Sequence, residues 1–388
     1  MKARQINTAS RSRKRTMKAG PVGKLRYTHL HTHARSGRSD GYAKGWNDGY
    51  RLGASHAIAR TIPVPDVPKR QLKVMFVREN STGYHLIESG IITALSKAVS
   101  EVMTATTLDP IAEIAERERP DLVLVLNGIF VLQPETLERI RSLGIRTAAW
   151  FADDPYFMEL STRLVPHYDH IFTHEAGVVN YYNSLGGKVS YLPFAAPVEL
   201  AAPTQVDHSY WTDVCLIGSG FPNRIAFIDR IAPYLKDKRV FIAGGLWNQL
   251  KAYGSLRSSI HLHGVPVNEA LNYYNGAKIV LNLHRNHELG AYAPHVSMMS
   301  VNPRTFEMNA CATLQLTDVR ADLTTLYTPG VTIETYRNAE ECVEKIRYYL
   351  SRDGERMELA LRGYEETRRS HTYEHRIMAI LQTIYGAS

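Results

Sequence analysis

Three side chains in the C-terminal third of the sequence could bind a ligand: His284, Arg285 and Glu307. The first two directly follow an apolar run, Ile279–Leu283, that has the length and composition of a buried strand. Glu307 lies one turn into a helix-like segment, Arg304–Cys311, that begins just after a proline. A guanidinium can bind a phosphate, and a carboxylate can accept hydrogen bonds from a sugar diol. We therefore interpret this stretch as a ligand site, the alternative being solvated surface charges.

The stretch lies within a regular alternation of apolar runs and helix-like segments that begins near Gln71. Runs of strand length form two series, separated by a proline- and alanine-rich connector, 193–210. The expected strands are 72–77, 102–105, 121–127, 146–151, 171–173, 189–192, 213–218, 239–244, 260–264, 279–283 and 313–317. Such alternation predicts mostly parallel sheets with right-handed crossovers.

We therefore expect an α/β protein with two Rossmann-like, doubly wound domains that face each other across a cleft. The first domain would span residues 71–205 and the second 206–370, and a last helix, 371–388, would cross back over the first. Ligands of doubly wound sheets bind at the carboxyl ends of the strands. Polar residues that directly follow a strand are therefore the first candidates for a site.

The turn that opens the second domain has the composition of a phosphate-binding turn. Gly218 and Ser219 follow an expected strand, and Arg224 lies in the first turns of the helix after it. Small residues let backbone N–H groups approach a phosphate at a helix N-terminus, and an arginine can add a bidentate contact. Rossmann-like domains need such a glycine turn in any case, so Arg224 could equally be a packing or surface residue.

Two adjacent carboxylates follow a strand of the first domain. Asp153 and Asp154 come directly after Phe151, where either could act as a general base on a hydroxyl group. Aspartate before proline also forms turns, which is the structural alternative. His85, in the loop after the first strand, is a third candidate base because its pKa lies near neutral pH.

Charge is distributed unevenly along the chain. The net charge is +8, yet residues 1–70 hold 16 Lys/Arg and 3 Asp/Glu, so the remaining chain is slightly acidic. A hydrophobic content of 44% is ordinary for a globular protein. No apolar run approaches the roughly 20 residues that span a bilayer. The basic N-terminus is not followed by the apolar segment that a secretory signal peptide needs. We expect a cytoplasmic protein.

The spacing of cysteine and histidine argues against a metal site. Three cysteines, Cys215, Cys311 and Cys342, form neither a metal-ligand pattern nor an even disulfide set. The histidines at 261, 263, 284, 287 and 295 match no standard zinc spacing. We expect no metal and no cofactor.

The first 70 residues form a separate basic extension. Residues 1–40 have few aliphatic side chains and are not expected to order by themselves. Within 41–60, glycines recur at 41, 45, 49 and 53, which would form one stripe on a helix. Such a helix could associate with another copy or an assembly partner, or the segment could be a flexible linker. Nucleic-acid binding by the extension is a minority interpretation.

The chain resembles the CgeB family of spore maturation proteins in six ordered stretches, which together cover about residues 70 to 388. They are WFADDP (150–155), DVCLIGSGFPNR (213–224), HGVP (263–266), KIVLNLHR (278–285), NPRTFEMNACATLQLTD (302–318) and HTYEHRI (371–377). The resemblance implies a glycosyltransferase of the GT-B arrangement, with a nucleotide-sugar donor that we expect to be a UDP-sugar. It also implies a connection to spore-surface glycosylation.

The resemblance assigns donor binding to the second domain. Retaining GT-B enzymes often carry an E-x7-E motif whose second Glu binds the ribose, and Glu307 matches that position. Met299 stands at the first position, so both stereochemistry and retained activity stay open. The residues expected to bind the donor are Gly218, Ser219, Arg224, Asn282, His284, Arg285, Arg304, Thr305 and Glu307.

The acceptor, a protein or a glycan, would bind the first domain. Two alternatives remain open from the sequence. The chain could be a non-catalytic coat or assembly protein that has kept the fold, or a nucleic-acid-directed glycosyltransferase recruited by its basic extension.

Overall fold

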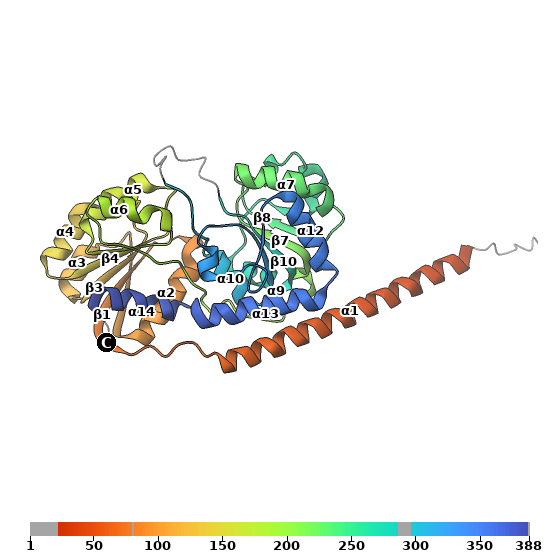
Figure 1. The fold of residues 1–388 in the computed structure, drawn as a ribbon, viewed down its shortest axis with the longest axis horizontal. Helices are drawn as coiled ribbons and strands as arrows, with labels where there is room; N and C mark the ends of the chain where they lie inside the picture. Colours follow the sequence, from red (N-terminus) through yellow and green to blue (C-terminus); the bar gives the residue numbers. More distant parts are fainter. Residues whose placement is uncertain (1–21, 80, 286–295, 387–388) are drawn as a thin grey trace, which may run out of the picture. The chain divides into compact units, whose positions relative to one another are not determined.

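The computed structural model, shown as a ribbon in Figure 1, describes residues 22–79, 81–285 and 296–386. The chain divides into two compact units, Met1–Gly49 and Tyr50–Ser388. Both β-sheets belong to the second unit, and so does every candidate site residue.

The first sheet has six parallel strands in the order β2-β1-β3-β4-β5-β6. Its strands are β1 (Arg70–Arg78), β2 (Val99–Thr106), β3 (Leu122–Leu126), β4 (Arg146–Phe151), β5 (His170–Thr173) and β6 (Val189–Tyr191). The connecting helices are α2 (His85–Ala98), α3 (Ile111–Glu118), α4 (Pro134–Ser142), α5 (Met158–Leu164) and α6 (Val179–Ser184). Every residue of β3 is buried, as expected for a central strand covered on both faces. The order of the chain reverses between β1 and β3.

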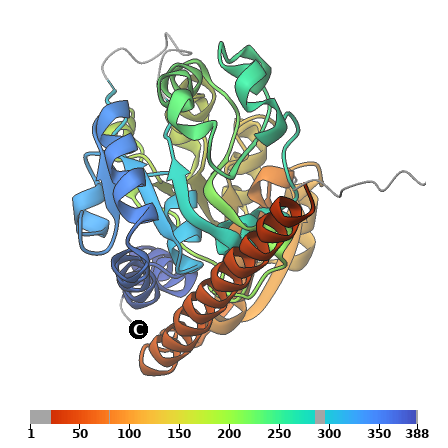
Figure 2. The same cartoon turned by 90° about the vertical axis from the view of Figure 1, so that its right-hand side faces the viewer.

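The second sheet repeats this design in the order β12-β11-β10-β7-β8-β9, also parallel, and its order reverses between β7 and β10. Its strands are β7 (Thr212–Ile217), β8 (Val240–Ala243), β9 (Ile260–His261), β10 (Ala277–Asn282), β11 (Leu314–Asp318) and β12 (Glu334–Tyr336). Its helices are α7 (Pro222–Leu235), α8 (Tyr253–Leu256), α9 (Val267–Gly276), α10 (Arg304–Ala310), α11 (Leu323–Leu326) and α12 (Ala339–Leu350). Figure 2 shows helices on both sides of its strands. The predicted α/β class with two doubly wound sheets is confirmed.

Two C-terminal helices follow. Helix α13 (Asp353–Ser370) packs against α10 and β11 of the second sheet, whereas α14 (Tyr373–Tyr385) packs against α2 of the first. The break between them falls at His371 and Thr372, where Thr372 and His375 form a capping box at the start of α14. Tyr373 and Ile377 lie in the apolar core beneath the first sheet. The two C-terminal helices therefore pack against different domains, α13 against the second and α14 against the first.

The N-terminal helix differs from expectation. Helix α1 runs from Val22 to Thr61. The expected helix over 41–60 lies within α1, which begins earlier than predicted, and residues 1–21 lie outside the described part. A helix satisfies its backbone hydrogen bonds internally, so it can extend from an anchored end without a core of its own.

The anchor of α1 is its C-terminal third. Arg51 is buried and donates from Nη1 to the carbonyl of Cys311, at 2.8 Å, and from Nη2 to the carbonyl of Thr204, at 3.1 Å. Ala54 and Ile58 pack against an apolar cluster at the C-terminal end of α10 and on α13. The expectation that everything up to residue 70 is independent of the enzyme body is therefore wrong from residue 50 onward.

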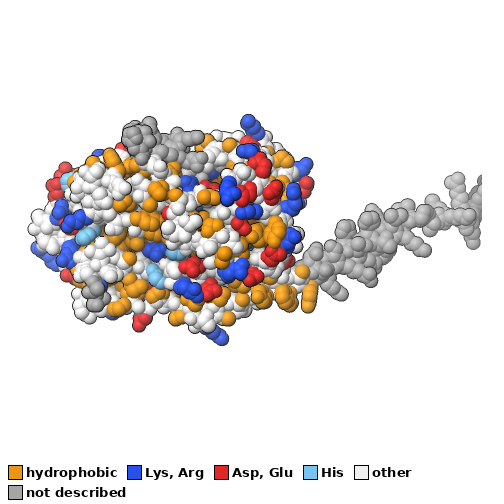
Figure 3. All heavy atoms as spheres, viewed as in Figure 1, with side chains coloured by type: hydrophobic (Ala, Val, Ile, Leu, Met, Phe, Trp, Pro, Cys, Tyr) orange, Lys and Arg blue, Asp and Glu red, His pale blue; other side chains and the backbone are white. Residues whose placement is uncertain are grey.

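The described surface carries charges of both signs. On the face drawn in Figure 3, Lys and Arg side chains stand beside Asp and Glu side chains. Within residues 22–79, 81–285 and 296–386, no helix combines the length and apolarity needed to cross a membrane.

Candidate active site

The turn after β7 lies where the order of the second sheet reverses, next to the end of β10. Gly218 has a φ of 147°, a conformation that L side chains rarely adopt. A Cβ at this position would lie 2.5 Å from Nη1 of Arg304 and 3.0 Å from Nη1 of Arg224. The indole of Trp247 fixes the turn by donating to the carbonyl of Gly218, at 2.8 Å. The glycine therefore lets two guanidinium groups approach the turn.

Arg224 is a buried cation, with 4% of its surface exposed. Its Nε donates to the carbonyl of Leu283, at 2.8 Å, and its Nη1 to that of Ser219, at 2.9 Å. Burial, together with the charge of Arg304, lowers the pKa of Arg224 to about 9. Its hydrogen-bond acceptors within the described chain are neutral carbonyls, and the charge of Asp318 offsets the fall in its pKa only in part.

Arg304 adds a second cation at the start of α10. Its Nη1 donates to the carbonyl of Ile217, at 2.7 Å, which draws the side chain over the same turn. Within the described residues neither Arg304 nor Arg224 forms an ion pair with a carboxylate. The two cations donate to different neutral carbonyls and repel each other, and an anion placed between them would relieve that repulsion.

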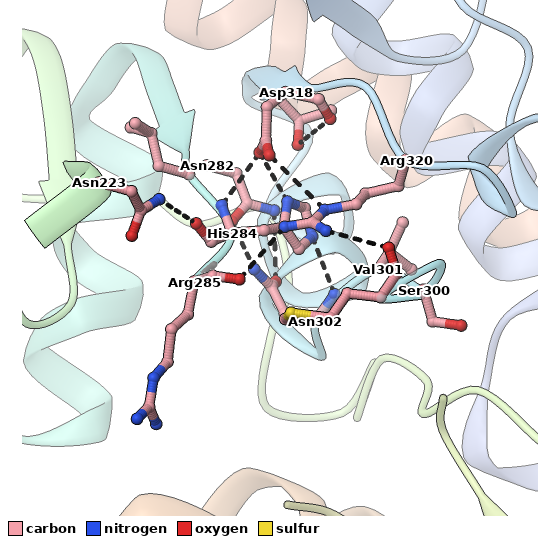
Figure 4. Close-up of polar contacts among 12 residues, drawn as sticks. Asn223, Asn282, His284, Arg285, Ser300, Val301, Asn302, Asp318 and Arg320 are labelled. Atoms are coloured by element: carbon pink, nitrogen blue, oxygen red, sulfur yellow. Dashed lines mark hydrogen bonds and ion pairs between the residues drawn. The ribbon is translucent and has the colours of Figure 1, made fainter. Parts of the chain in front are cut away.

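Arg285 lies just past β10, as predicted, and its side chain reaches two aromatic rings. Its guanidinium lies 4.3 Å from the ring centre of Tyr156, on the first domain, and 4.3 Å from that of Phe221, on the second. Figure 4 shows the side chain pointing away from the polar cluster around His284. Its Nε is buried with no hydrogen-bond partner in the part of the chain that the structure describes. Arg285 therefore stacks between aromatic rings of the two domains.

Three further predicted donor residues form an inner layer that positions α10. The ring of His284 donates from Nδ1 to Asp318, at 2.6 Å, because its Nε2 accepts the backbone N–H of Asn302, at 3.0 Å (Figure 4). Burial lowers the pKa of His284, which keeps the ring neutral. Asn282 donates to Thr305 and exchanges amide hydrogen bonds with Asn302. The polar groups of Asn282, His284 and Thr305 thus bind one another and their neighbours, which indicates a role in positioning α10, while their predicted contact with the donor stays a prediction.

Glu307 is placed as predicted, on α10 beyond Arg304. It is 8% exposed, and burial raises its pKa to about 7 although the charge of Arg304 opposes the shift. None of the hydrogen bonds between described residues involves its carboxylate. A buried acceptor without a protein donor is suited to the hydroxyl groups of a ligand.

The two adjacent aspartates of the first domain differ sharply in their surroundings. Asp154 is 1% exposed and accepts hydrogen bonds from the hydroxyls of Ser161, Thr173 and Tyr182, at 2.7 to 3.0 Å. Burial raises the pKa of Asp154. Its oxygens are occupied within the core, so the prediction that Asp154 acts as a base is not supported. The turn-forming alternative describes it better.

Asp153 remains at the edge of the sheet. Its Oδ2 accepts from the hydroxyl of Tyr84, at 2.6 Å, and from the amide of Asn127, at 2.8 Å, while Oδ1 accepts no hydrogen bond from the described residues. His85 begins α2 next to Tyr84 and is exposed. The structure brings Asp153 together with Tyr84 and Asn127, and it does not bring His85 into this group.

Glu79 was missed by the sequence analysis. It directly follows β1, and its Oε2 accepts the backbone N–H of Gly128, at 2.8 Å, at the end of β3. Burial and the charges of Asp153 and Glu88 raise the pKa of Glu79 to about 7. Its position after a strand beside the reversal of strand order is the signal that could have found it.

Glu175, after β5, was also missed, and it joins the two domains. Its Oε1 accepts the backbone N–H of Met299, at 2.8 Å, and its Oε2 that of Ser300, at 3.3 Å. Met299 stands where an E-x7-E motif would place its first Glu. A carboxylate of the first domain therefore binds the backbone at the position where that acidic side chain is missing.

A hollow of about 490 Å³ opens beside β9, two strands from the turn at Gly218. It is lined in part by Tyr253, Arg257, His261, His263, Gly264 and Glu269. Two of the histidines considered as zinc ligands thus line an open hollow, while His287 and His295 lie outside the described residues. The hollow is large enough for part of a nucleotide.

Comparison with known proteins finds similarity to glycosyltransferases. The sequence model of the glycosyl transferase-like family matches residues 224–382, which include α10 and the ends of β10 and β11. The spore protein CgeB of Bacillus subtilis (strain 168) is 29% identical over 278 residues, covering 70% of this chain and 85% of that protein. The chain is thus similar to CgeB over most of its length. The resemblance inferred from its six stretches is confirmed.

Solved structures support the same fold. HepE of Anabaena in complex with UDP and glucose has a TM-score of 0.56 at 10% identity, covering 82% of this chain and all of that one. Sucrose-phosphate synthase of Thermosynechococcus elongatus has a TM-score of 0.55 at 11% identity, with the same coverage. These likenesses establish the fold alone. Together with the match to the glycosyl transferase-like model, they confirm the predictions of a GT-B fold and of a glycosyltransferase.

Proposed function

We propose that this protein transfers a sugar from a UDP-sugar to an acceptor hydroxyl. The observation that carries the proposal is the pair of guanidinium groups, Arg224 and Arg304, that meet at the Gly218 turn without a carboxylate partner. A diphosphate supplies the missing negative charge. The HepE structures contain UDP, UDP and glucose, or UDP-glucose, which supports a uridine nucleotide by analogy.

The donor would lie along the carboxyl edge of the second sheet. Its diphosphate would contact Arg224, Arg304 and the backbone at Ser219, and the ribose diol would donate to Glu307. The base would extend toward the hollow beside β9, which lies at the same edge. Asn282, His284 and Thr305 would hold α10 in the position that this arrangement needs.

The reaction would form a bond between an acceptor oxygen and the anomeric carbon, while the bond from that carbon to the diphosphate breaks. UDP leaves with the bonding electrons, and the two guanidinium groups stabilise the charge that it gains. Asp153 is the proposed base, because its Oδ1 lies at the sheet edge and could accept the hydroxyl proton. The name of the CgeB protein suggests a spore-surface acceptor.

A binding experiment tests this function directly. UDP and UDP-glucose should raise the melting temperature of the full-length protein, and calorimetric titration should give one site per chain, because a ligand that binds only the native state stabilises it. Adenosine diphosphate and free glucose serve as controls for the base and the sugar. Stabilisation by none of these nucleotides would contradict the proposal, and stronger binding of adenosine diphosphate would contradict the choice of UDP.

A further inference from the structure

The carboxyl edge of the first sheet carries a second set of uncompensated charges. Asn127 and Gly128, after β3, hold two carboxylates from neighbouring strands: the Asn127 amide donates to Asp153, and the Gly128 N–H donates to Glu79, each at 2.8 Å. Glu79 follows β1 and Asp153 follows β4. The chain reverses direction between β1 and β3, the position at which doubly wound sheets bind ligands.

These acidic side chains have no cationic partner within the described chain, and the pKa of Glu79, about 7, means that a proton neutralises part of it near neutral pH. Glu79, Asp153 and the buried Glu88 accept hydrogen bonds from backbone, amide and phenol groups, and no described Lys or Arg pairs with any of them. Besides the Gly128 N–H, the side chain of Asn127 also hydrogen-bonds Glu79. Asp153 uses only Oδ2 in these contacts, so its Oδ1 is an acceptor for which the described chain provides no donor. The ionised carboxylates would repel an anionic ligand.

An exposed aromatic ring adjoins the carboxylates. Phe130, two residues after Gly128, is 48% exposed, and Val131 beside it is 40% exposed. Phe130 packs edge-on against Phe157, with 5.0 Å between the ring centres, so the ring is held in place while part of it faces solvent. Phe157 lies four residues after Asp153. Large exposed apolar side chains beside polar groups commonly mark a binding surface.

We propose that this edge is the acceptor site for a neutral saccharide, whose apolar ring face packs against Phe130 while its hydroxyls donate to Glu79 and Asp153. The inference rests on the proposed transferase function and adds the chemical class of the acceptor. Neighbouring hydroxyls of one sugar ring can donate hydrogen bonds to two carboxylates at once. A single serine or threonine hydroxyl has only one proton to donate. A polyanion such as nucleic acid is disfavoured by the three carboxylates.

Saturation-transfer NMR and titration with maltose, cellobiose and N,N′-diacetylchitobiose, in the presence of UDP, provide the test on the full-length protein. The variants are Phe130→Ala and Glu79→Gln, with Tyr348→Ala as the control, because Tyr348 is an exposed aromatic residue of α12, 40% exposed. At least one disaccharide should bind, and each of the first two variants should bind it about tenfold more weakly, as expected for loss of a charged hydrogen bond or of an aromatic contact. The control should bind like the parent.

UDP affinity, measured in each variant, separates this inference from the transferase proposal. Unchanged UDP binding together with weakened disaccharide binding supports the acceptor site. If no disaccharide binds the parent, if both variants bind like the parent, or if a heparin fragment or a serine-rich peptide binds better, the inference is wrong. Failure of the parent to bind UDP would instead overturn the proposed function. Phe130 is half exposed, so its replacement should leave the fold intact.

Discussion

The carboxyl edges of the two sheets have the same topology and opposite charge. At the second sheet, where strand order reverses between β7 and β10, Arg224 and Arg304 meet without a carboxylate in the described chain. At the first sheet, where it reverses between β1 and β3, Glu79 and Asp153 meet without a cation. The strand order thus determines where a ligand lies, and the residues after each strand determine which ligand binds.

The difference suggests a division of labour between the edges. The edge of the second sheet, with Arg224 and Arg304, is the cationic edge and suits a diphosphate donor. The edge of the first sheet, with Glu79 and Asp153, is the anionic edge and suits an acceptor hydroxyl that must lose a proton. Isolated charges of one sign are costly when partly buried, so their persistence at both edges fits ligand-binding roles better than structural ones. Asp154 shows the contrast, because its carboxylate is surrounded by three hydroxyl donors and belongs to the core.

The largest expected effect lies at the anionic edge. Replacing Asp153 by Asn should lower the rate of UDP release from UDP-glucose, measured with the acceptor disaccharide, by about 100-fold or more, because a general base contributes that much. UDP affinity should be unchanged. The paired variant Asp154→Asn should instead lower the unfolding free energy by about 1–3 kcal/mol through loss of buried hydrogen bonds. If Asp153→Asn retains the turnover of the parent, Asp153 is not the general base.

The cationic edge is tested by Arg304→Gln. Loss of a charged contact to the diphosphate should weaken UDP binding by about 2–3 kcal/mol in calorimetric titration. Arg230→Gln is the matched control, because Arg230 forms an exposed ion pair with Glu340 on the same domain. Equal UDP affinity in the two variants would mean that the diphosphate binds elsewhere.

Glu307 should have a smaller, pH-dependent effect on the affinity for UDP-glucose. Its pKa of about 7 means that the carboxylate becomes ionised, and a stronger acceptor for the ribose, between about pH 6 and 8. UDP-glucose affinity should therefore rise over this range, and Glu307→Gln should remove the rise and weaken binding at pH 8 by about 1–3 kcal/mol. UDP-glucose is the suitable probe because its diphosphate diester does not titrate there. A pH dependence that persists in the variant would assign it to another group.

The same group makes a prediction for stability. Because the folded-state pKa of about 7 exceeds the ordinary value of 4.5, the folded protein holds a proton between these pH values that the unfolded chain has lost. The unfolding free energy should therefore fall as pH rises from 4.5 to 7. Urea titrations of Glu307→Gln and the parent should differ by that slope.

The smallest effect is expected from the basic extension. Deleting residues 1–49 should leave UDP affinity unchanged, because the cationic edge and not the extension binds the donor. If residues 41–60 mediate self-association, as the sequence suggested, the deletion should also lower the number of chains per particle, measured as mass by light scattering. Unlike the deletion, Arg51→Ala should lower the unfolding free energy by about 1–3 kcal/mol, since the buried hydrogen bonds of Arg51 are lost. Lost UDP affinity in the deletion would place part of the donor site in the extension.

The alternation of strands and helices made most of the fold predictable. The sequence analysis missed α5, α8, α9, α11 and β12. Two of them illustrate different reasons. Helix α9 follows Pro266 and could have been inferred, because two parallel strands need a crossover between them. Strand β12 has three residues at the edge of the sheet, and its pairing with β11 depends on tertiary contacts that a short run does not reveal.

The position of the candidate residues at the ends of strands was predictable, but their surroundings were not. Asp153 and Asp154 are chemically identical and differ only in the groups that surround them. In the same way, His284 and Asn282 lie beside the donor edge but bind their neighbours. Whether a polar side chain is satisfied within the fold depends on residues distant in sequence, and local patterns do not contain that information.

Hydrogen–deuterium exchange with and without UDP tests the separation of the two edges most directly. UDP should protect the backbone of Ile217–Arg224 and of Asn302–Glu307 at the second sheet, and leave Asn127–Val131 and Asp153–Phe157 at the first sheet unchanged. Protection at the first-sheet edge without protection at the Gly218 turn would contradict the account.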